Sequence, residues 1–179
     1  MSQDVRGTLE KAAEEAFAGM RAYHRSEIDH KRDAITVLTT VLAGNGGLVA
    51  AGFGALGHAD RIGWLPIAAV AVVVFAATAI LATQIVNATN DKIESDGRRY
   101  QEFKAQSISA KMLLGLYAPI TTEHGTLTLL EEPKPSLGKA KTQRILDTFL
   151  SLVVIFSLVG WLALIAAWMA ADAFAGAGT

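Results

Sequence analysis

The chain has 179 residues, 51% of them hydrophobic, and its formal net charge is −1 at pH 7. The length suits a single domain, and the near-neutral charge lacks the basic field that nucleic acid-binding proteins use, so nucleic acid is not expected as a partner. The sequence contains no cysteine, which excludes disulfides and thiolate metal sites.

Residues 1–33 are polar and charged and contain no proline. Apolar side chains recur there at steps of three to four residues, which is the period of one face of an α-helix. The members of this stripe are Val5, Leu9, Ala13, Phe17 and Met20. We therefore expect a cytoplasmic amphipathic helix that continues directly into the apolar segment that follows it.

Residues 34–86 predict a transmembrane hairpin. The segments 34–56 and 64–86 are each 23 residues long and free of Asp, Glu, Lys and Arg. At ~1.5 Å per residue each helix is roughly 35 Å long, enough to cross the ~30 Å hydrocarbon core of a bilayer. A core helix of a soluble protein rarely stays apolar on every face over this length, so the lipid bilayer is the expected partner.

Small residues are unusually frequent in the first of these two spans. They form two ladders with a spacing of four residues, a pattern that lets helices in lipid approach closely. The ladders are Gly46, Ala50 and Gly54, and Gly47, Ala51 and Ala55. We predict that these residues pack against a helix and that the chain forms a homo-oligomer.

The remainder of the chain adds a polar helix, a loop and another span. Residues 87–118 are charged around an apolar stripe and predict a cytoplasmic helix that pairs antiparallel with the first one. Residues 119–144 contain proline and glycine breakers and predict a cytoplasmic loop. Residues 145–171 predict a third transmembrane helix, with an external tail at 172–179. The expected fold class is all-α: an integral membrane helical protein with three transmembrane helices and cytoplasmic amphipathic helices.

The distribution of basic residues predicts the orientation. All of the 16 Lys and Arg residues except Arg61 lie in residues 1–33 or 87–148. Because basic residues concentrate in cytoplasmic segments, we expect the N-terminus and the central region in the cytoplasm and the C-terminus outside.

Polar side chains inside the apolar segments are the candidate functional residues. Asn45 lies at the middle of the first span. The others are Thr36, Thr40, Thr78, Thr83, Gln84 and Ser157. One interpretation is hydrogen bonding between helices, and the other is a polar lining of a pore. The sequence leaves both interpretations open.

Two short motifs invite chemical interpretations that their context does not favour. Residues 52–57 match GxGxxG, but they lie inside a span rather than between a strand and an amphipathic helix. Glu27 and His30 match a Glu-x-x-His half-motif, whereas carboxylate metal sites need a second half-motif on another helix. With no cluster of nucleophile, acid and base either, we expect no enzyme activity, no cofactor and no metal site.

The order of a charged helix, a hairpin and a polar helix with the sequence DGRRYQEFKA (residues 96–105) resembles the SLATT group of small bacterial membrane effectors over residues 23–110. Residues 30–49, HKRDAITVLTTVLAGNGGLV, are also similar to the hairpin entrance of Pycsar-type membrane effectors. Those effectors carry a late span preceded by basic residues, as at 139–144 here. The third span departs from the two-span SLATT plan, and no nucleotide-binding residues carry over.

The resemblance implies a function in anti-phage defence. It implies an oligomeric, channel-like effector of the bacterial inner membrane that perturbs the membrane when a cyclic nucleotide or a partner protein acts on its cytoplasmic helices. The alternative is a non-conducting, membrane-anchored scaffold whose cytoplasmic helices bind a partner.

Overall fold

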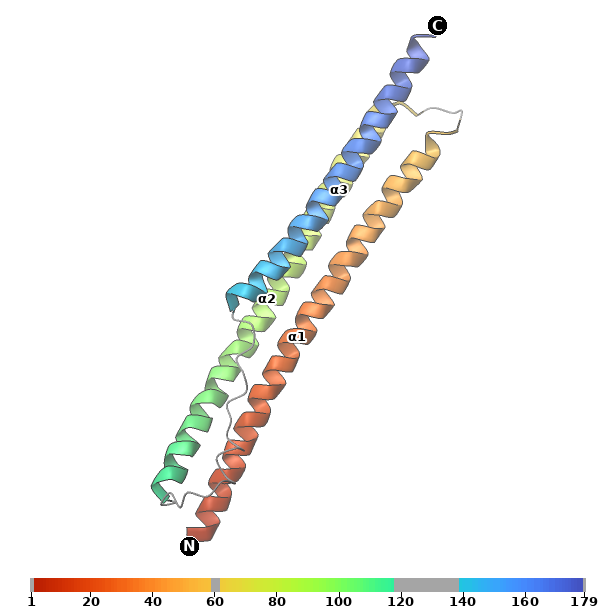
Figure 1. Cartoon of the computed structure of the whole chain (residues 1–179). Helices are drawn as coiled ribbons and strands as arrows, with labels where there is room; N and C mark the ends of the chain where they lie inside the picture. Colours follow the sequence, from red (N-terminus) through yellow and green to blue (C-terminus); the bar gives the residue numbers. More distant parts are fainter. Residues whose placement is uncertain (1, 59–61, 118–138, 179) are drawn as a thin grey trace. The chain divides into compact units, whose positions relative to one another are not determined.

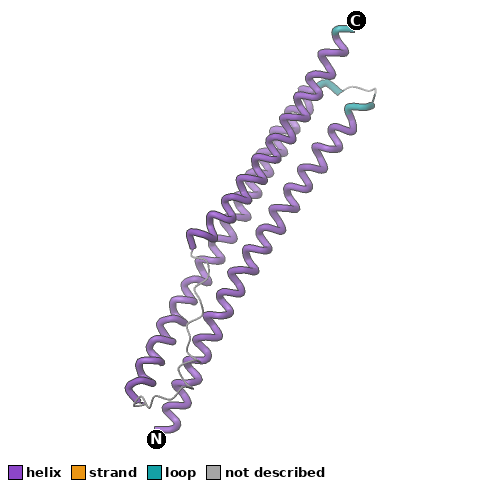
Figure 2. The backbone as a smooth tube through the Cα atoms, in the orientation of Figure 1, coloured by secondary structure: helices purple, strands orange, loops and turns teal. Residues whose placement is uncertain are grey.

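The computed structural model describes residues 2–58, 62–117 and 139–178, and these residues form three helices (Figure 1). They are α1 (Ser2–Ala55), α2 (Trp64–Tyr117) and α3 (Lys139–Gly176). Figure 2 shows that helix accounts for nearly all of the described backbone, and no strand occurs in these three ranges. The predicted all-α class is confirmed, and all three helices are long and apolar enough to cross a membrane.

The predicted continuation of the first charged helix into the first apolar segment is confirmed, and the second apolar segment and the charged helix after it, predicted separately, are also joined in one helix. α1 and α2 each have 54 residues and each contain a charged segment and an apolar one. Glycines within α1 lower its helix propensity by about 1 kcal/mol each relative to alanine in water. The helix nevertheless continues through them to Ala55.

The third helix is longer than the predicted span at 145–171. It begins at Lys139 and ends at Gly176, so it includes residues that we had assigned to the loop and to the tail. No proline or glycine lies between Gly138 and Gly160 to end a helix there. The rest of the predicted loop, residues 118–138, lies outside the described residues.

The chain divides into two compact units, which we describe separately. Residues 1–31 and 90–139 form one, called the polar unit below, and residues 32–89 and 140–179 form the other, called the apolar unit.

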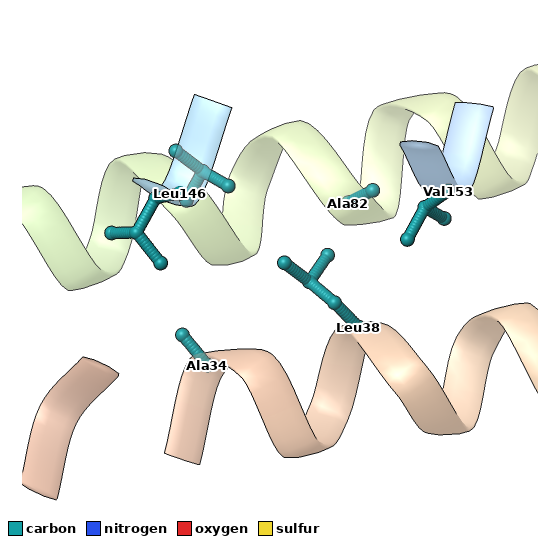
Figure 3. Close-up of a cluster of buried hydrophobic side chains, with 6 residues drawn as sticks. Ala34, Leu38, Ala82, Leu146 and Val153 are labelled. Atoms are coloured by element: carbon teal, nitrogen blue, oxygen red, sulfur yellow. The ribbon is translucent and has the colours of Figure 1, made fainter. Parts of the chain in front are cut away.

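In the apolar unit, three helices bury apolar side chains against one another. Figure 3 shows one such cluster, in which Leu38 of α1 points toward Ala82 of α2. The buried members are Ala34, Leu38, Ala82, Val86, Leu146 and Val153. A second cluster contains Ala71 of α2 and Trp161, Leu164 and Trp168 of α3. Where one helix supplies several of these side chains, they lie three, four or seven residues apart, which places them on one face.

Close approach of α1 to α3 occurs at Gly52 and Gly160, which lie outside the two predicted ladders. A Cβ atom at Gly52 would overlap the side chain of Leu164, and one at Gly160 would lie 3.5 Å from Cγ2 of Val49. The ladder glycines Gly46, Gly47 and Gly54 have no atom within 4 Å of a Cβ position. Ala50 and Ala51 are exposed as well. The ladders are therefore not used in packing within one chain, and their part in self-association stays a prediction.

Asp172 of α3 caps the first turn of α2. Its Oδ2 atom accepts a hydrogen bond of 3.2 Å from the backbone N–H of Trp64. The first N–H groups of a helix have no partner within the helix, and a carboxylate also interacts favourably with the helix dipole.

We expect Asp172→Ala to lower the stability of the apolar unit by about 1 kcal/mol, the usual cost of a lost cap. Denaturant unfolding of the purified chain in micelles, followed by circular dichroism, measures the change. Asp147→Ala is the matched control, because Asp147 is an exposed carboxylate on the same helix. Equal losses in the two variants would mean that the cap contributes nothing.

Candidate functional site

A hydrogen-bonded network centred on Asn45 connects the three helices of the apolar unit. Asn45 is 3% exposed, and its Nδ2 atom donates to Oγ1 of Thr78 at 2.5 Å and to Oγ of Ser157 at 3.3 Å. Its Oδ1 atom accepts a hydrogen bond of 3.3 Å from the indole N–H of Trp161. One side chain of α1 thus bonds to α2 and twice to α3.

The chemistry of the partners sets the direction of each hydrogen bond in this network. An indole N–H only donates, so the oxygen of the Asn45 amide has to face Trp161. The amide nitrogen then faces the two hydroxyls, which accept. The Thr78 hydroxyl in turn donates to the backbone carbonyl of Val74 at 2.8 Å.

The structure divides the candidate polar residues into two groups. Asn45, Thr78 and Ser157 lie together and are buried. The hydroxyls of Thr36, Thr40 and Thr83 are exposed and donate to the carbonyl four residues earlier in their own helix. Gln84 is also exposed. The first group connects helices within one chain, and the second group does not.

Sequence reasoning missed Trp161 as a member of the network. Tryptophan in a membrane protein usually lies at the ends of a span, where its N–H reaches the headgroup region. Trp161 lies near the middle of the third apolar segment and is 5% exposed. Its position was the available signal, because an indole N–H at that depth needs an acceptor on another helix.

Aromatic rings hold the two helices of the polar unit together. The rings of Tyr23 and Tyr100 lie 5.0 Å apart, and those of His24 and Tyr100 lie 5.3 Å apart. At Gly19 the helices approach so closely that a Cβ atom would lie 2.6 Å from the ring of Phe103. Going forward along α1 from Gly19 to Tyr23, the partners on α2 go backward from Phe103 to Tyr100. The two charged helical segments therefore pair antiparallel, as predicted.

Polar groups beside these rings connect the same two helices. The Oδ2 atom of Asp96 accepts a hydrogen bond of 3.1 Å from the Ser26 hydroxyl and lies 3.2 Å from Nε2 of His30. Within α1, Lys31 and Glu27 form an ion pair of 2.7 Å, and their side chains are only 12% and 3% exposed. Buried charges need such partners, because an uncompensated charge away from water is costly.

The same surroundings act on Tyr23. Burial raises the pKa of its phenol, and the charges of Glu27, Asp96 and Tyr100 raise it further. The phenol is therefore neutral at physiological pH and stays so into alkaline solution.

His24 has two buried ring nitrogens whose hydrogen-bonding capacity is not used in the described part of the polar unit. Both of its ring nitrogens are buried, and neither has a hydrogen-bond partner among the residues that the structure describes. A buried polar group without a partner costs about 1–3 kcal/mol.

We expect His24→Phe to stabilise the polar unit by about 1–3 kcal/mol, because phenylalanine keeps the ring contacts with Tyr23 and Tyr100 without the unsatisfied nitrogens. Amide hydrogen exchange over residues 6–31 is the measurement, with slower exchange as the expected result. His30→Phe is the contrasting variant and should speed exchange, since it removes the contact with Asp96. Faster exchange in His24→Phe would show that a polar partner of His24 had been lost.

The two residues of the Glu27/His30 half-motif have separate partners. Glu27 pairs with Lys31, and His30 faces Asp96. Within the described residues no group of three His, Cys, Asp or Glu side chains is arranged to hold a metal ion. Gly52 and Gly54 of the GxGxxG motif are helical residues of α1.

Comparisons of this chain with protein-family models, with characterised protein sequences and with solved structures found no match.

Proposed function

We propose that this chain is an oligomeric membrane effector: the apolar unit spans a bilayer, and a trigger that acts on the polar unit alters the packing of the spans and perturbs the membrane. The observation that carries the proposal is that α1 and α2 each contain both a charged segment and an apolar one in a single continuous helix. In this proposal, a change in the pairing of the charged segments acts on the apolar segments through these two helices.

The contacts of the polar unit suit such a trigger. Its two helices are held together by specific side-chain contacts. Two of these contacts join Asp96 of α2 to Ser26 and His30 of α1. The resemblance described above suggests that a cyclic nucleotide or a partner protein acts here, and that the membrane is the bacterial inner membrane.

Self-association supplies the oligomer in this proposal. The outward face of α1 in the apolar unit carries the exposed small residues Gly47, Ala51 and Gly54. Helices in lipid associate by close packing, which small residues permit. Because the Asn45 amide already bonds within its own chain, a conducting path would form between copies or by rearrangement of this network.

The test is expression of the chain in bacteria loaded with a membrane-potential dye. Wild-type chain, together with its trigger, should collapse the potential, and Gly54→Leu should reduce the effect by blocking close approach of copies. Gly7→Leu is the control, because Gly7 is exposed, lies outside the apolar unit and has no atom within 4 Å of a Cβ position. An unchanged potential with normal growth would reject the effector function.

The second candidate is a non-conducting scaffold whose polar unit binds a partner. Its specific support is that Asn45 and Thr78 form their hydrogen bonds inside one chain, which is the arrangement expected of helices that only hold together. Retention of a partner on the membrane without any change in potential favours this candidate.

We expect a reporter fused within residues 120–141 to behave as cytoplasmic and one fused after Thr179 to behave as external, because of the concentration of Lys and Arg in residues 1–33 and 87–148. Alkaline phosphatase and fluorescent-protein fusions measure this. The opposite result at both positions would invert the orientation.

A further inference from the structure

An open hollow of about 350 Å³ lies between α1 and α3 of the apolar unit. Its walls are the side chains of Leu42, Val49 and Phe156, and its polar lining is Asn45 and Ser157. Gly46 also lines it, and the space beside Gly46 is open, since no atom lies within 4 Å of a Cβ position there. The volume lies at the lower end of the ~300–1,000 Å³ range of small-molecule sites.

The Ser157 hydroxyl has a hydrogen-bond capacity that the chain does not use. Its oxygen accepts from Asn45 at 3.3 Å, but no group among the described residues accepts its proton. Ser151 of the same helix behaves differently, because its hydroxyl donates to the carbonyl of Asp147 at 2.8 Å. Ser157 is 3% exposed, so the hydroxyl proton that has no acceptor is buried beside the hollow.

An unsatisfied buried donor is costly, so an acceptor on a bound molecule would stabilise the site. The apolar walls exclude a predominantly polar molecule. A single water fits poorly as well, because an ordered buried water needs two to four polar partners and the hollow is much larger than one water. The lining therefore suits a largely apolar molecule that presents a hydrogen-bond acceptor to Ser157.

The depth of the site within the span limits which molecules can supply that acceptor. Asn45 is the middle residue of segment 34–56, roughly 16 Å from either end at ~1.5 Å per residue. The ester carbonyls of a phospholipid lie at the headgroup boundary, close to the ends of a span. A small molecule that places a carbonyl at the level of Asn45 has to dissolve wholly in hydrocarbon.

From this geometry we infer that the hollow between α1 and α3 is a binding site for a lipid-soluble carbonyl compound of the quinone type, whose oxygen accepts the hydrogen bond of Ser157. The inference rests on the proposed insertion of the apolar unit into a bilayer. Gly46 leaves the room for the ring, and Leu42, Val49 and Phe156 contact its apolar part. The Asn45 network fixes the position of Ser157.

The experiment uses the full chain in lipid nanodiscs and tritiated decylubiquinone as the probe, with empty nanodiscs subtracted. Wild type should show saturable binding. Ser157→Ala should weaken it about tenfold, which corresponds to one hydrogen bond. Gly46→Leu should abolish saturable binding by filling the hollow. Gly44→Leu is the matched control and should bind as wild type, because Gly44 is exposed on the same span and does not line the hollow.

Dodecylbenzene, an apolar ring with a chain but no carbonyl, is the contrasting probe and should bind at least tenfold more weakly. Equal binding of the two probes, or equal binding by wild type and Ser157→Ala, would overturn the inference. Ser157→Thr keeps the hydroxyl that Ser157→Ala removes, and it should bind as wild type. This comparison separates a lost hydrogen bond from a misfolded variant.

Carbonate extraction of membranes separates the two proposals. Wild-type chain that stays in the membrane but shows no saturable binding overturns the carbonyl site alone. Wild-type chain that is recovered in the soluble fraction overturns both the membrane function and the site.

Discussion

Replacement of Asn45 by leucine is expected to lower the stability of the apolar unit by roughly 2–4 kcal/mol. Three hydrogen bonds are lost, and each bond between helices in lipid contributes ~0.6 kcal/mol on average and up to ~1.7 kcal/mol. The indole N–H of Trp161 is left without its acceptor. The branched leucine side chain also has to fit at a position that is 3% exposed.

Unfolding of the purified chain by increasing SDS in mixed micelles, followed by circular dichroism, measures this loss. Thr78→Val should cost about 1 kcal/mol, because it removes one acceptor of the Asn45 amide. Thr83→Val is the matched control on the same helix and should change stability by less than about 0.5 kcal/mol. Thr83 is exposed and bonds only to the carbonyl of Ala79.

The same variant tests the pore interpretation. If the Asn45 amide lined a conducting path, Asn45→Leu would abolish leakage of liposomes while the chain stayed folded and inserted, because an apolar constriction loses its water. If Asn45 only connects helices, leakage and stability should fall together. Equal leakage from wild type and variant would remove Asn45 from any conducting path.

Replacement of Gly19 by leucine is expected to separate the two helices of the polar unit. A Cβ atom at this position would lie 2.6 Å from Cε2 of Phe103, far inside the normal contact distance. Overpacking of this kind costs roughly 1–3 kcal/mol. The contacts between Tyr23 and Tyr100 and between Ser26 and Asp96 lie within two turns of Gly19 or of Phe103 and should weaken with it.

Hydrogen exchange is the measurement, and residues 6–31 and 90–110 should exchange faster in Gly19→Leu than in wild type. Gly7→Leu is the control, because Gly7 is exposed on the same helix with no atom within 4 Å of a Cβ position. The double variant Gly19→Leu/Phe103→Ala should recover much of the protection, since the smaller residue makes room. If the double variant exchanges as fast as Gly19→Leu, the ring of Phe103 is not the cause.

Under the proposed function, Gly19→Leu also mimics or blocks the trigger. A change in membrane potential without added trigger would mean that pairing of the charged segments holds the effector inactive. Loss of the triggered response would mean that pairing is required for activity. If Gly19→Leu changes neither the membrane potential without trigger nor the triggered response, the pairing in the polar unit has no part in the function.

The structure shows why the network was only partly predictable. Asn45, Thr78 and Ser157 were identified from sequence because polar side chains inside apolar segments need partners. The partners of Asn45 lie 33, 112 and 116 residues away, however, and no local pattern pairs them. Thr36 and Thr40 have the same chemistry in the same segment, yet they point outward and bond to their own helix.

The all-α class, the three apolar segments and the antiparallel pairing in the polar unit were predictable from the sequence, because length, charge and periodicity can be read along the chain. The inward face of the spans was decided only by the tertiary structure. A soluble helix marks its inward face by a contrast between apolar and polar residues, but a span is apolar on every face and has no such contrast. For this reason the sequence pointed to Gly46 and Gly54, whereas the helices meet within the chain at Gly52 and Gly160.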